Sequence, residues 1–340
     1  MREKVMREKV CLVIVALFMS FHVDAQNKAL KFGEDGKFKI VQFTDIHYKS
    51  GNPNSQVALD RMNEVLDAEK PDLVVYTGDL IYSAPAGSGI RTVVEPASRR
   101  GIPFAVVLGN HDDEFDLKRH ELIEVIKDMP GNYTSTTAGL SGVTNFILTV
   151  KGAKEDKDEA VLYFFDTHAY STIKEVKGYD WLKFDQISWY ISNSKSFTGK
   201  NEGTSLPALA FFHIPLPEYN QAASDEDAKL VGSRMEKACA PALNTGMFTA
   251  MLENKDVMAT FVGHDHNNDY AVLQKGILLC YGRFTGGNTV YNDLPEGNGA
   301  RVIELEEGKR SFKTYIRIKD GKTLYHINYP ESFRKNVIEK

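Results

Sequence analysis

Short apolar runs alternate with longer amphipathic stretches along the first third of the chain. Residues 38–43, 73–76 and 103–107 are mainly apolar, and each run predicts a strand. Between the first two runs, residues 55–70 carry apolar side chains at helical spacing, and a further helix is expected before Arg100. Apolar strands separated by helices are typical of a buried parallel sheet flanked by helices. The chain is therefore expected to adopt an α/β fold.

The rest of the chain continues both patterns. Helices are predicted at residues 115–128, 183–194 and 245–254, and strands at residues 145–150, 160–166, 206–212 and 257–262. Residues 270–327 contain short strands and turns, which we expect to form a second sheet. Since no repeat, low-complexity segment or clear linker interrupts the chain, residues 26–340 are predicted to form a single domain.

Side chains that bind metals follow five of the predicted strands. They are Asp45 and His47, Asp79, Asn110 and His111, His213, and His264 with His266. Because open α/β sheets hold their sites at the carboxyl ends of the strands, we expect these side chains to converge. One motif alone, such as Gly109-Asn110-His111-Asp112, is also compatible with an ordinary turn, since Gly, Asn and Asp favour turns. Five such strand ends together predict a metal site.

A mixed set of imidazole, carboxylate and carboxamide ligands suits zinc, iron or manganese and does not suit copper(I). Two adjacent cations about 3.5–4 Å apart would stabilise both oxygens of an in-line displacement at phosphorus. A bridging aspartate would use its two oxygens, which point apart, to contact both cations. Water between the cations would lose a proton near neutral pH, so the reaction would need no Ser or Cys nucleophile.

These five blocks, spanning residues 45–266, resemble those of the calcineurin-like metallophosphoesterase superfamily. Residues 178–186, 211–219 and 263–270 further resemble its purple-acid-phosphatase-like subgroup. The resemblance implies a four-layer α/β/β/α sandwich of two mixed sheets flanked by helices, with a dinuclear metal site at the carboxyl ends of the strands.

The resemblance also assigns roles to individual residues. It implies that Asp45, His47 and His266 hold the first metal ion. It implies that Asn110, His213 and His264 hold the second, and that Asp79 bridges the pair. His111 matches the histidine that donates a proton to the leaving oxygen after a metal-bridging hydroxide attacks phosphorus.

One position departs from the pattern of many relatives. Three residues after the bridging aspartate, where many members carry an aspartate that orients the catalytic histidine, this chain has Tyr82. True purple acid phosphatases bind ferric iron through a tyrosine there, but they lack the histidine present here as His47. We expect His47 to be the ligand and Tyr82 to lie behind it, since a phenolate ligand needs a strongly acidic cation. Asp112 is the nearest candidate in sequence to orient His111, although adjacent side chains rarely face one another.

Candidates for substrate contact are less distinctive. Arg283 can offer its guanidinium to a phosphate, or can be an exposed arginine in a turn. His168, at the end of a predicted strand, is a weaker candidate for lining the pocket. Glu114 and His120 are interpreted as solvated residues at the start of a helix.

The N-terminus predicts export. Residues 1–25 combine a basic head, an apolar core at 11–19 and a small-x-small site ending at Ala25, as in a secretory signal peptide. Cleavage there would leave 315 residues with a net charge of −6, compared with −5 for the whole chain. This balance gives no support to nucleic-acid binding, and no later segment suggests a membrane anchor. Cys239 and Cys280 would remain, either paired or as free thiols.

The sequence thus predicts a secreted or periplasmic phosphoesterase with two metal ions and a small phosphorylated substrate, with monoesters favoured. A phosphodiesterase acting through the same site is one alternative. A metal-binding family member without catalysis is another. The oligomeric state is not indicated.

Overall fold

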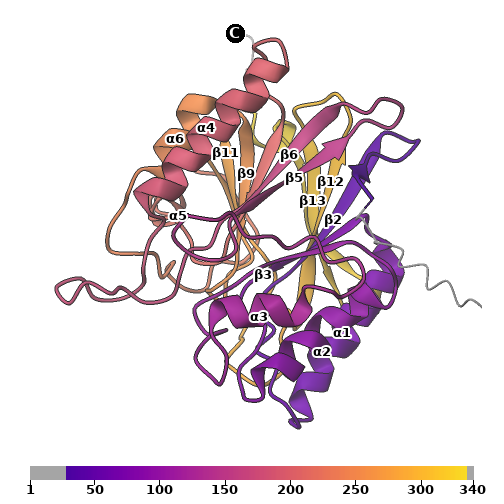
Figure 1. Ribbon diagram of the computed structural model, residues 1–340, viewed down its shortest axis with the longest axis vertical. Helices are drawn as coiled ribbons and strands as arrows, with labels where there is room; N and C mark the ends of the chain where they lie inside the picture. Colours follow the sequence, from indigo (N-terminus) through magenta and orange to yellow (C-terminus); the bar gives the residue numbers. More distant parts are fainter. Residues whose placement is uncertain (1–27, 335–340) are drawn as a thin grey trace, which may run out of the picture.

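The computed structural model describes residues 28–334. Two β-sheets pack face to face, and helices cover the outer face of each sheet, as Figure 1 shows. The four layers are therefore helix, sheet, sheet and helix, as predicted. The predicted signal peptide, residues 1–25, lies outside the described residues.

The six-stranded sheet contains the first three predicted strands. Its strands, in spatial order, are β14 (Thr323–Tyr329), β13 (Phe312–Ile318), β12 (Gly299–Glu306), β2 (Lys37–Phe43), β3 (Leu73–Thr77) and β4 (Phe104–Val107). β2, β3 and β4 are parallel, whereas β12 runs antiparallel to β2. Helices α1 (Asn54–Glu69), α2 (Ala86–Ser98) and α3 (Arg119–Ile126) connect or follow the parallel strands.

The eight-stranded sheet is built from the middle of the chain. Its strands, in spatial order, are β1 (Leu30–Lys31), β5 (Phe146–Lys151), β6 (Asp158–Phe164), β7 (Ala208–Phe211), β9 (Val257–Val262), β11 (Ile277–Tyr281), β10 (Ala271–Gln274) and β8 (Leu230–Val231). Its outer face packs against α4 (Phe184–Lys200), α5 (Glu218–Ala223) and α6 (Met247–Asn254). Short 3₁₀ turns occupy Lys319–Gly321 and Glu331–Phe333.

Both faces of β3 and β4 are buried, which explains why their sequences are almost entirely apolar, and residues 40–43 of β2 are buried in the same way. Ile40 of β2 contributes to the core between the sheets together with Phe164 and Phe211 of the other sheet. Val41, the next residue, points to the opposite face and packs in the cluster that contains Met62 of α1. A hydrogen bond from Nε2 of the buried Gln42 to the Val262 carbonyl, 3.0 Å long, joins the two sheets near the ends of β2 and β9.

The prediction of a separate second sheet over residues 270–327 is wrong. β10 and β11 extend the sheet that contains β9, whereas β12, β13 and β14 return to pair beside β2. The helix predicted at residues 115–128 is also shorter, because α3 begins at Arg119. Residues 115–118 belong instead to the irregular segment that follows the Gly109-Asn110-His111-Asp112 motif.

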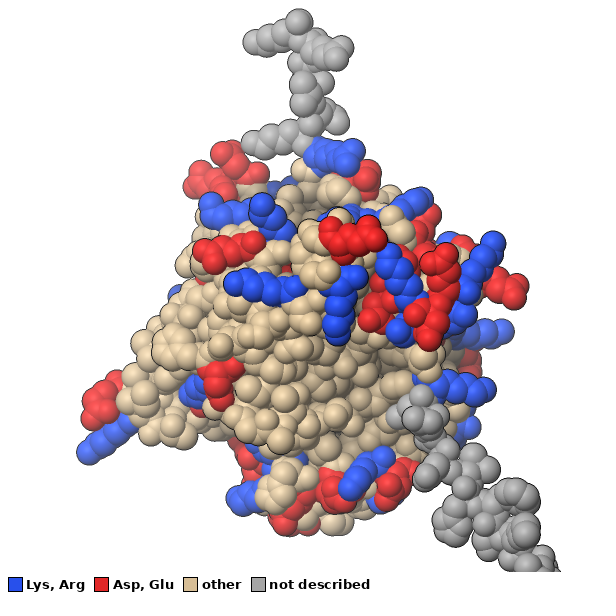
Figure 2. Space-filling view, turned by 45° about the horizontal axis from the view of Figure 1, so that its top comes forward, with Lys and Arg blue, Asp and Glu red and all other residues tan. Residues whose placement is uncertain are grey.

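Cys239 and Cys280 are both free thiols; Cys280 is buried in β11 and Cys239 is exposed. On the face shown in Figure 2, Lys and Arg are interspersed with Asp and Glu, and a broad central area carries few charged side chains. Within residues 28–334, no helix is long and apolar enough to cross a membrane.

Candidate metal centre

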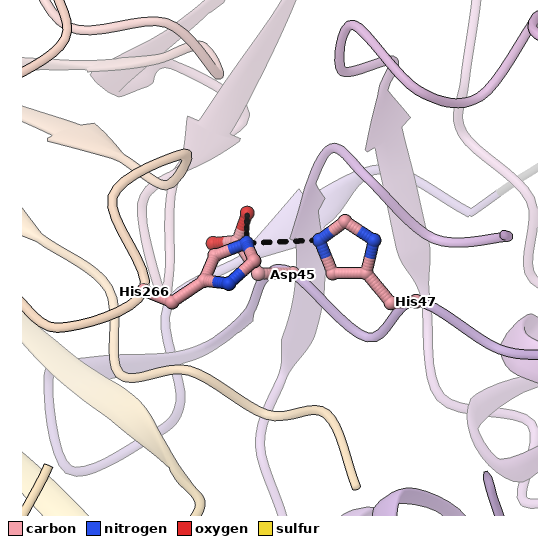
Figure 3. A group of neighbouring side chains, drawn as sticks. All are labelled: Asp45, His47 and His266. Carbon is pink, nitrogen blue, oxygen red and sulfur yellow. Dashed lines mark hydrogen bonds and ion pairs between the residues drawn. The ribbon is translucent and has the colours of Figure 1, made fainter. Parts of the chain in front are cut away.

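Asp45, His47 and His266 form one group of convergent side chains, shown in Figure 3. The two Nε2 atoms of His47 and His266 lie 3.0 Å apart, and Nε2 of His266 lies 3.8 Å from Oδ1 of Asp45. All three side chains are buried. A buried carboxylate and two facing imidazole nitrogens form a donor set suited to a divalent cation.

Asp79, His213 and His264 form a second buried group. Its centre is Nε2 of His213, which lies 3.1 Å from Oδ2 of Asp79 and 3.3 Å from Nδ1 of His264. Asn110 joins this group, because its Oδ1 lies 3.2 Å from the same nitrogen. The structure therefore brings together the residues predicted for the second metal ion.

Asp79 lies between the two groups. Its Oδ2 atom is 3.1 Å from Nε2 of His213 and 3.7 Å from Nε2 of His47. Its other oxygen, Oδ1, accepts the backbone N–H of His111 at 2.9 Å. In the metal-free chain one oxygen of Asp79 therefore faces both groups, and its role as a bridge between two cations stays a prediction.

Backbone carbonyls fix the tautomers of two of the histidines. Nδ1 of His213 lies 2.8 Å from the Thr77 carbonyl, and Nδ1 of His266 lies 3.0 Å from the Tyr291 carbonyl. Since a carbonyl can only accept a hydrogen bond, each Nδ1 donates its proton. When either ring is neutral, its Nε2 therefore carries the lone pair and directs it into the site, as a metal ligand requires.

Burial and neighbouring charges shift the pKa values of these groups. Burial lowers the pKa of His47 and of His264 well below the usual value, and lowers the pKa of His266 to about 4. Burial also raises the pKa of Asp45 to about 7. Neutral imidazoles are ready to bind a cation, and a cation would in turn compensate the buried charge of Asp45.

The pKa values of Asp79 and His213 shift in directions opposite to those of the other carboxylate and imidazoles of the site. Burial alone raises the pKa of Asp79, but the charge and hydrogen bond of His213, together with the charges of His47 and His111, outweigh it and hold the pKa well below the usual value. Burial alone lowers the pKa of His213, but the carboxylate of Asp79 outweighs it and raises the pKa to about 9. In the protein without cations, these two groups therefore form an ion pair at the position where the resemblance implies the second metal ion.

The backbone at the site is strained in the way common at functional sites. Asp45, His47, Asp79 and His264 all have positive φ angles, between 46° and 83°. Gly109 permits the close approach of two loops, because a Cβ atom there would lie 2.1 Å from Oδ1 of Asp79. The tight turns after β2, β3 and β9 thus direct the ligands inward and leave no space for a side chain at this glycine.

Asp112 and Arg119 hold the loop that carries Asn110 and His111. The buried carboxylate of Asp112 accepts the backbone N–H groups of Asp79, Leu80, Ile81 and Gly109 at 2.7–3.2 Å. The guanidinium of Arg119 donates to the carbonyl of Gly109 at 2.7 Å and pairs with the buried Asp166 at 2.6 Å. These contacts fix the path of the backbone around the site.

The carboxylate that contacts the imidazole of His111 belongs to Glu114. Nδ1 of His111 lies 2.8 Å from Oε2 of Glu114, whereas Asp112 is fully used by backbone donors. Glu114 is exposed, as expected, but it lies in the irregular segment before α3 and not at a helix start, and its carboxylate also contacts His111. One signal was available: a single turn places side chains i and i+3 on the same side, and the Glu114 N–H indeed bonds to the His111 carbonyl at 3.3 Å.

Tyr82 packs its ring beside His47 and His111. The ring centroids lie 5.1 Å from His47 and 5.0 Å from His111, both at nearly perpendicular angles. Lys49 places its ammonium 4.7 Å from the centre of the Tyr82 ring. The ring thus lies behind the His47 ligand position; whether the hydroxyl binds a metal ion stays a prediction.

The two predicted substrate candidates, Arg283 and His168, have different surroundings. Arg283 is fully buried and pairs with Asp269, and Nε donates to the Gly297 carbonyl at 3.0 Å, so its proposed contact with a phosphate is wrong. Nε2 of His168 lies 3.0 Å from Oε1 of Gln186, and the His168 N–H donates to Asp166. His168 thus takes part in the hydrogen-bond network around Asp166.

Comparisons with known proteins agree with this geometry. The calcineurin-like phosphoesterase family profile matches residues 38–268. The chain is 33% identical to "Probable inactive purple acid phosphatase 29" of Arabidopsis thaliana, covering 89% of this chain and 86% of that protein. It is also 33% identical to "Phosphatase DCR2" of Saccharomyces cerevisiae, covering 91% of this chain and 60% of that protein. The crystal structure of a dimetal phosphatase from Danio rerio has a TM-score of 0.59 at 13% identity, covering 86% of this chain and 99% of that one, which indicates a shared fold.

Proposed function

The chain belongs to the calcineurin-like phosphoesterase family and is similar to purple-acid-phosphatase-like proteins, and we propose that it is an active two-metal phosphoesterase with a preference for monoesters. The observation that carries this proposal is the complete ligand arrangement. Two groups of buried donors lie on either side of Oδ2 of Asp79, and His111 lies next to them, its ring 5.5 Å from that of His47.

Two cations fit this donor set, and zinc, iron and manganese suit its imidazole and carboxylate ligands best. When bound, they would polarise phosphoryl oxygens and lower the pKa of water between them. The residues of the chain position the cations and their ligands. Asp79 keeps the two positions close together, and the carbonyls of Thr77 and Tyr291 keep the rings of His213 and His266 in the tautomer that binds.

His111 is proposed as the proton donor. Its Nδ1 is bound to Glu114, so Nε2 is the nitrogen that can transfer a proton to the oxygen of the leaving group. His111 also lies outside both groups of ligands, which leaves it free for this role.

The second candidate is a family member that binds metal ions without catalysis. It is favoured by the name of the Arabidopsis relative, which describes that protein as inactive. The complete ligand set and the contact of His111 with Glu114 favour catalysis in this chain.

An assay distinguishes these candidates. The protein is purified without added metals, loaded separately with zinc, manganese or ferrous iron, and tested with nitrophenyl phosphate and bis-nitrophenyl phosphate. We expect turnover of the monoester with at least one metal, and slower turnover of the diester. Binding of metal without turnover of either ester would overturn the catalytic proposal, and faster turnover of the diester would overturn the monoester preference.

Export is a separate proposal. It rests on residues 1–25, which lie outside the described residues. Mass spectrometry of the protein recovered from a secreting host tests it. A mature chain beginning at Gln26 supports cleavage after Ala25, and a full-length intracellular product contradicts it.

A further inference from the structure

Glu114 connects the imidazole of His111 to a tyrosine on a different segment of the chain. Its Oε2 lies 2.8 Å from Nδ1 of His111, and its Oε1 accepts the hydroxyl proton of Tyr170 at 3.1 Å. The Tyr170 oxygen in turn lies 3.4 Å from Nδ2 of Asn110, so it can accept a hydrogen bond from that amide. Both carboxylate oxygens of Glu114 are therefore engaged, one by each ring.

The other groups around His111 do not offer it a carboxylate. Asp112 is occupied by four backbone N–H groups. Tyr82 and His47 contact His111 through their rings, whose centroids lie 5.0 and 5.5 Å from that of the His111 ring. Among the described residues, Glu114 is thus the acidic side chain that bonds to the ring of His111.

Tyr170 is held by its own neighbours. Its ring stacks on that of Tyr179 with centroids 5.6 Å apart, and the Tyr179 ring meets His264 edge-on at 4.3 Å. Residues 170 and 179 are also joined by a β-bridge. The segment between β6 and α4 therefore places the hydroxyl of Tyr170 against Glu114.

We propose that Glu114 is a positioning residue that selects the tautomer and orientation of His111, and that Tyr170 orients Glu114. This inference rests on the proposed function. Water adds to phosphorus and gives up a proton to solvent as the bond between phosphorus and the leaving oxygen breaks. The electron pair of that bond stays on the leaving oxygen, which takes the proton from Nε2 of His111. His111 is then neutral. Its remaining proton stays on Nδ1, which donates it in the hydrogen bond to Glu114. Glu114 holds the ring through Nδ1 and does not contact the substrate.

Two substrates separate positioning of a proton donor from a general structural effect. Phenyl phosphate has a poor leaving group and needs a proton, whereas dinitrophenyl phosphate has a good one and does not. For Glu114→Ala we expect kcat on phenyl phosphate to fall about 10–100-fold with KM within about 2-fold, and kcat on dinitrophenyl phosphate to fall less than about 3-fold. Glu114→Gln, which keeps the acceptor oxygen and removes the charge, should show a smaller loss of the same kind. For Tyr170→Phe we expect kcat on phenyl phosphate to fall about 2–5-fold. In a Glu114→Ala background, Tyr170→Phe should lower kcat no further.

Glu124→Gln is the matched control, since Glu124 lies on α3 and pairs with Lys127 on the surface. It should behave as wild type. In a His111→Ala background, Glu114→Ala should cause no further loss, because Glu114 acts through that ring. Equal losses on both substrates, additive losses with His111→Ala, or no loss at all would each overturn the inference.

A readout without turnover keeps this inference separate from the proposed function. In zinc-loaded protein labelled with ¹⁵N-histidine, NMR should show the proton of neutral His111 on Nδ1, and Glu114→Ala should give a mixture of tautomers. If wild-type protein hydrolyses no ester but this change in tautomer is seen, the proposed function fails and the positioning contact stands. An unchanged tautomer in Glu114→Ala overturns the positioning role whatever the activity.

Discussion

Oδ2 of Asp112 accepts the backbone N–H of Asp79 at 3.0 Å. The same carboxylate also bonds to the N–H groups of Leu80, Ile81 and Gly109, so it cross-links the loops that follow β3 and β4. The aspartate that ends the Gly109-Asn110-His111-Asp112 motif therefore fixes the backbone of the proposed bridging residue. Its role is to hold two ligand-bearing loops at a constant distance.

Replacing Asp112 by Asn should destabilise the protein. An amide has one acceptor oxygen, so at least two of the four buried N–H groups would lose their partner, at a cost of about 3 kcal/mol. Urea unfolding of the metal-free protein measures this loss. Asp113→Asn is the control, because Asp113 is partly exposed and contacts Arg119 at 3.2 Å. Equal stability of the two variants would contradict the cross-linking role.

Replacing Asp79 by Asn should empty both metal positions. Oδ2 of Asp79 faces Nε2 of His47 and Nε2 of His213, so its charge serves both groups. We expect bound metal, measured by mass spectrometry of the elements, to fall from roughly two ions per chain to fewer than one, with loss of the metal-dependent rise in Tm. Asp265→Asn is the control, since that carboxylate bonds to the Tyr281 hydroxyl at 2.6 Å. If Asp79→Asn retained both ions, Asp79 would not bridge.

Replacing His111 by Ala should reduce turnover of phenyl phosphate roughly 10²–10⁴-fold, because the leaving oxygen would lose its proton donor. Metal content should stay unchanged, since His111 belongs to neither ligand group. Parallel measurements of kcat and bound metal test both parts. His120→Ala, at an exposed position on α3, should match wild type. Loss of metal from His111→Ala would show that His111 is a ligand.

Replacing Arg283 by Met should lower stability and leave catalysis intact. The substitution would leave the fully buried carboxylate of Asp269 without its ion-pair partner, which should lower the free energy of unfolding by about 3–5 kcal/mol. Urea unfolding should detect this loss, while KM for nitrophenyl phosphate should change less than about 2-fold. Arg91→Met, at an exposed site on α2, serves as the control. A large rise in KM without loss of stability would restore Arg283 as a contact for phosphate.

The ion pair of Asp166 with Arg119 should contribute to acid sensitivity. Burial alone raises the pKa of Asp166, but Arg119 outweighs it and lowers the pKa from 3.8 to about 2. Because the folded state binds this proton more weakly than the unfolded state, the stabilisation is complete above about pH 4 and is lost as the pH falls through about 2. The stability difference between metal-free wild type and Asp166→Asn should narrow by about 2 kcal/mol from about pH 6 to about pH 2. A constant difference across urea titrations in this range would contradict the linkage.

The ligands were predictable from sequence because parallel strands bring their carboxyl ends to one edge. The strand predicted at residues 257–262 agrees with β9, and the turn that follows it places His264 and His266 in separate groups. Periodicity and strand-end chemistry are local properties, and both can be read without knowledge of distant contacts.

Features that depend on distant partners could not be predicted in the same way. No local pattern indicates that β12 pairs with β2, since that pairing joins residues 301 and 42. Arg283 looks like a surface residue until Asp269 and the Gly297 carbonyl are seen to surround it. Glu114 is a different case, because its partner His111 lies only three residues away and the spacing from i to i+3 is a local signal.

The position of β2 between β12 and β3 has a consequence for synthesis on the ribosome. The earliest ligand motif emerges with β2, but His47 meets His266 only after a further 219 residues have been added. The antiparallel neighbour of β2 emerges later still, as residues 299–306. Until then the nascent chain exposes an unpaired, apolar strand edge, the kind of surface that promotes aggregation and engages chaperones. Loading of the metal centre must therefore follow translation of nearly the whole domain.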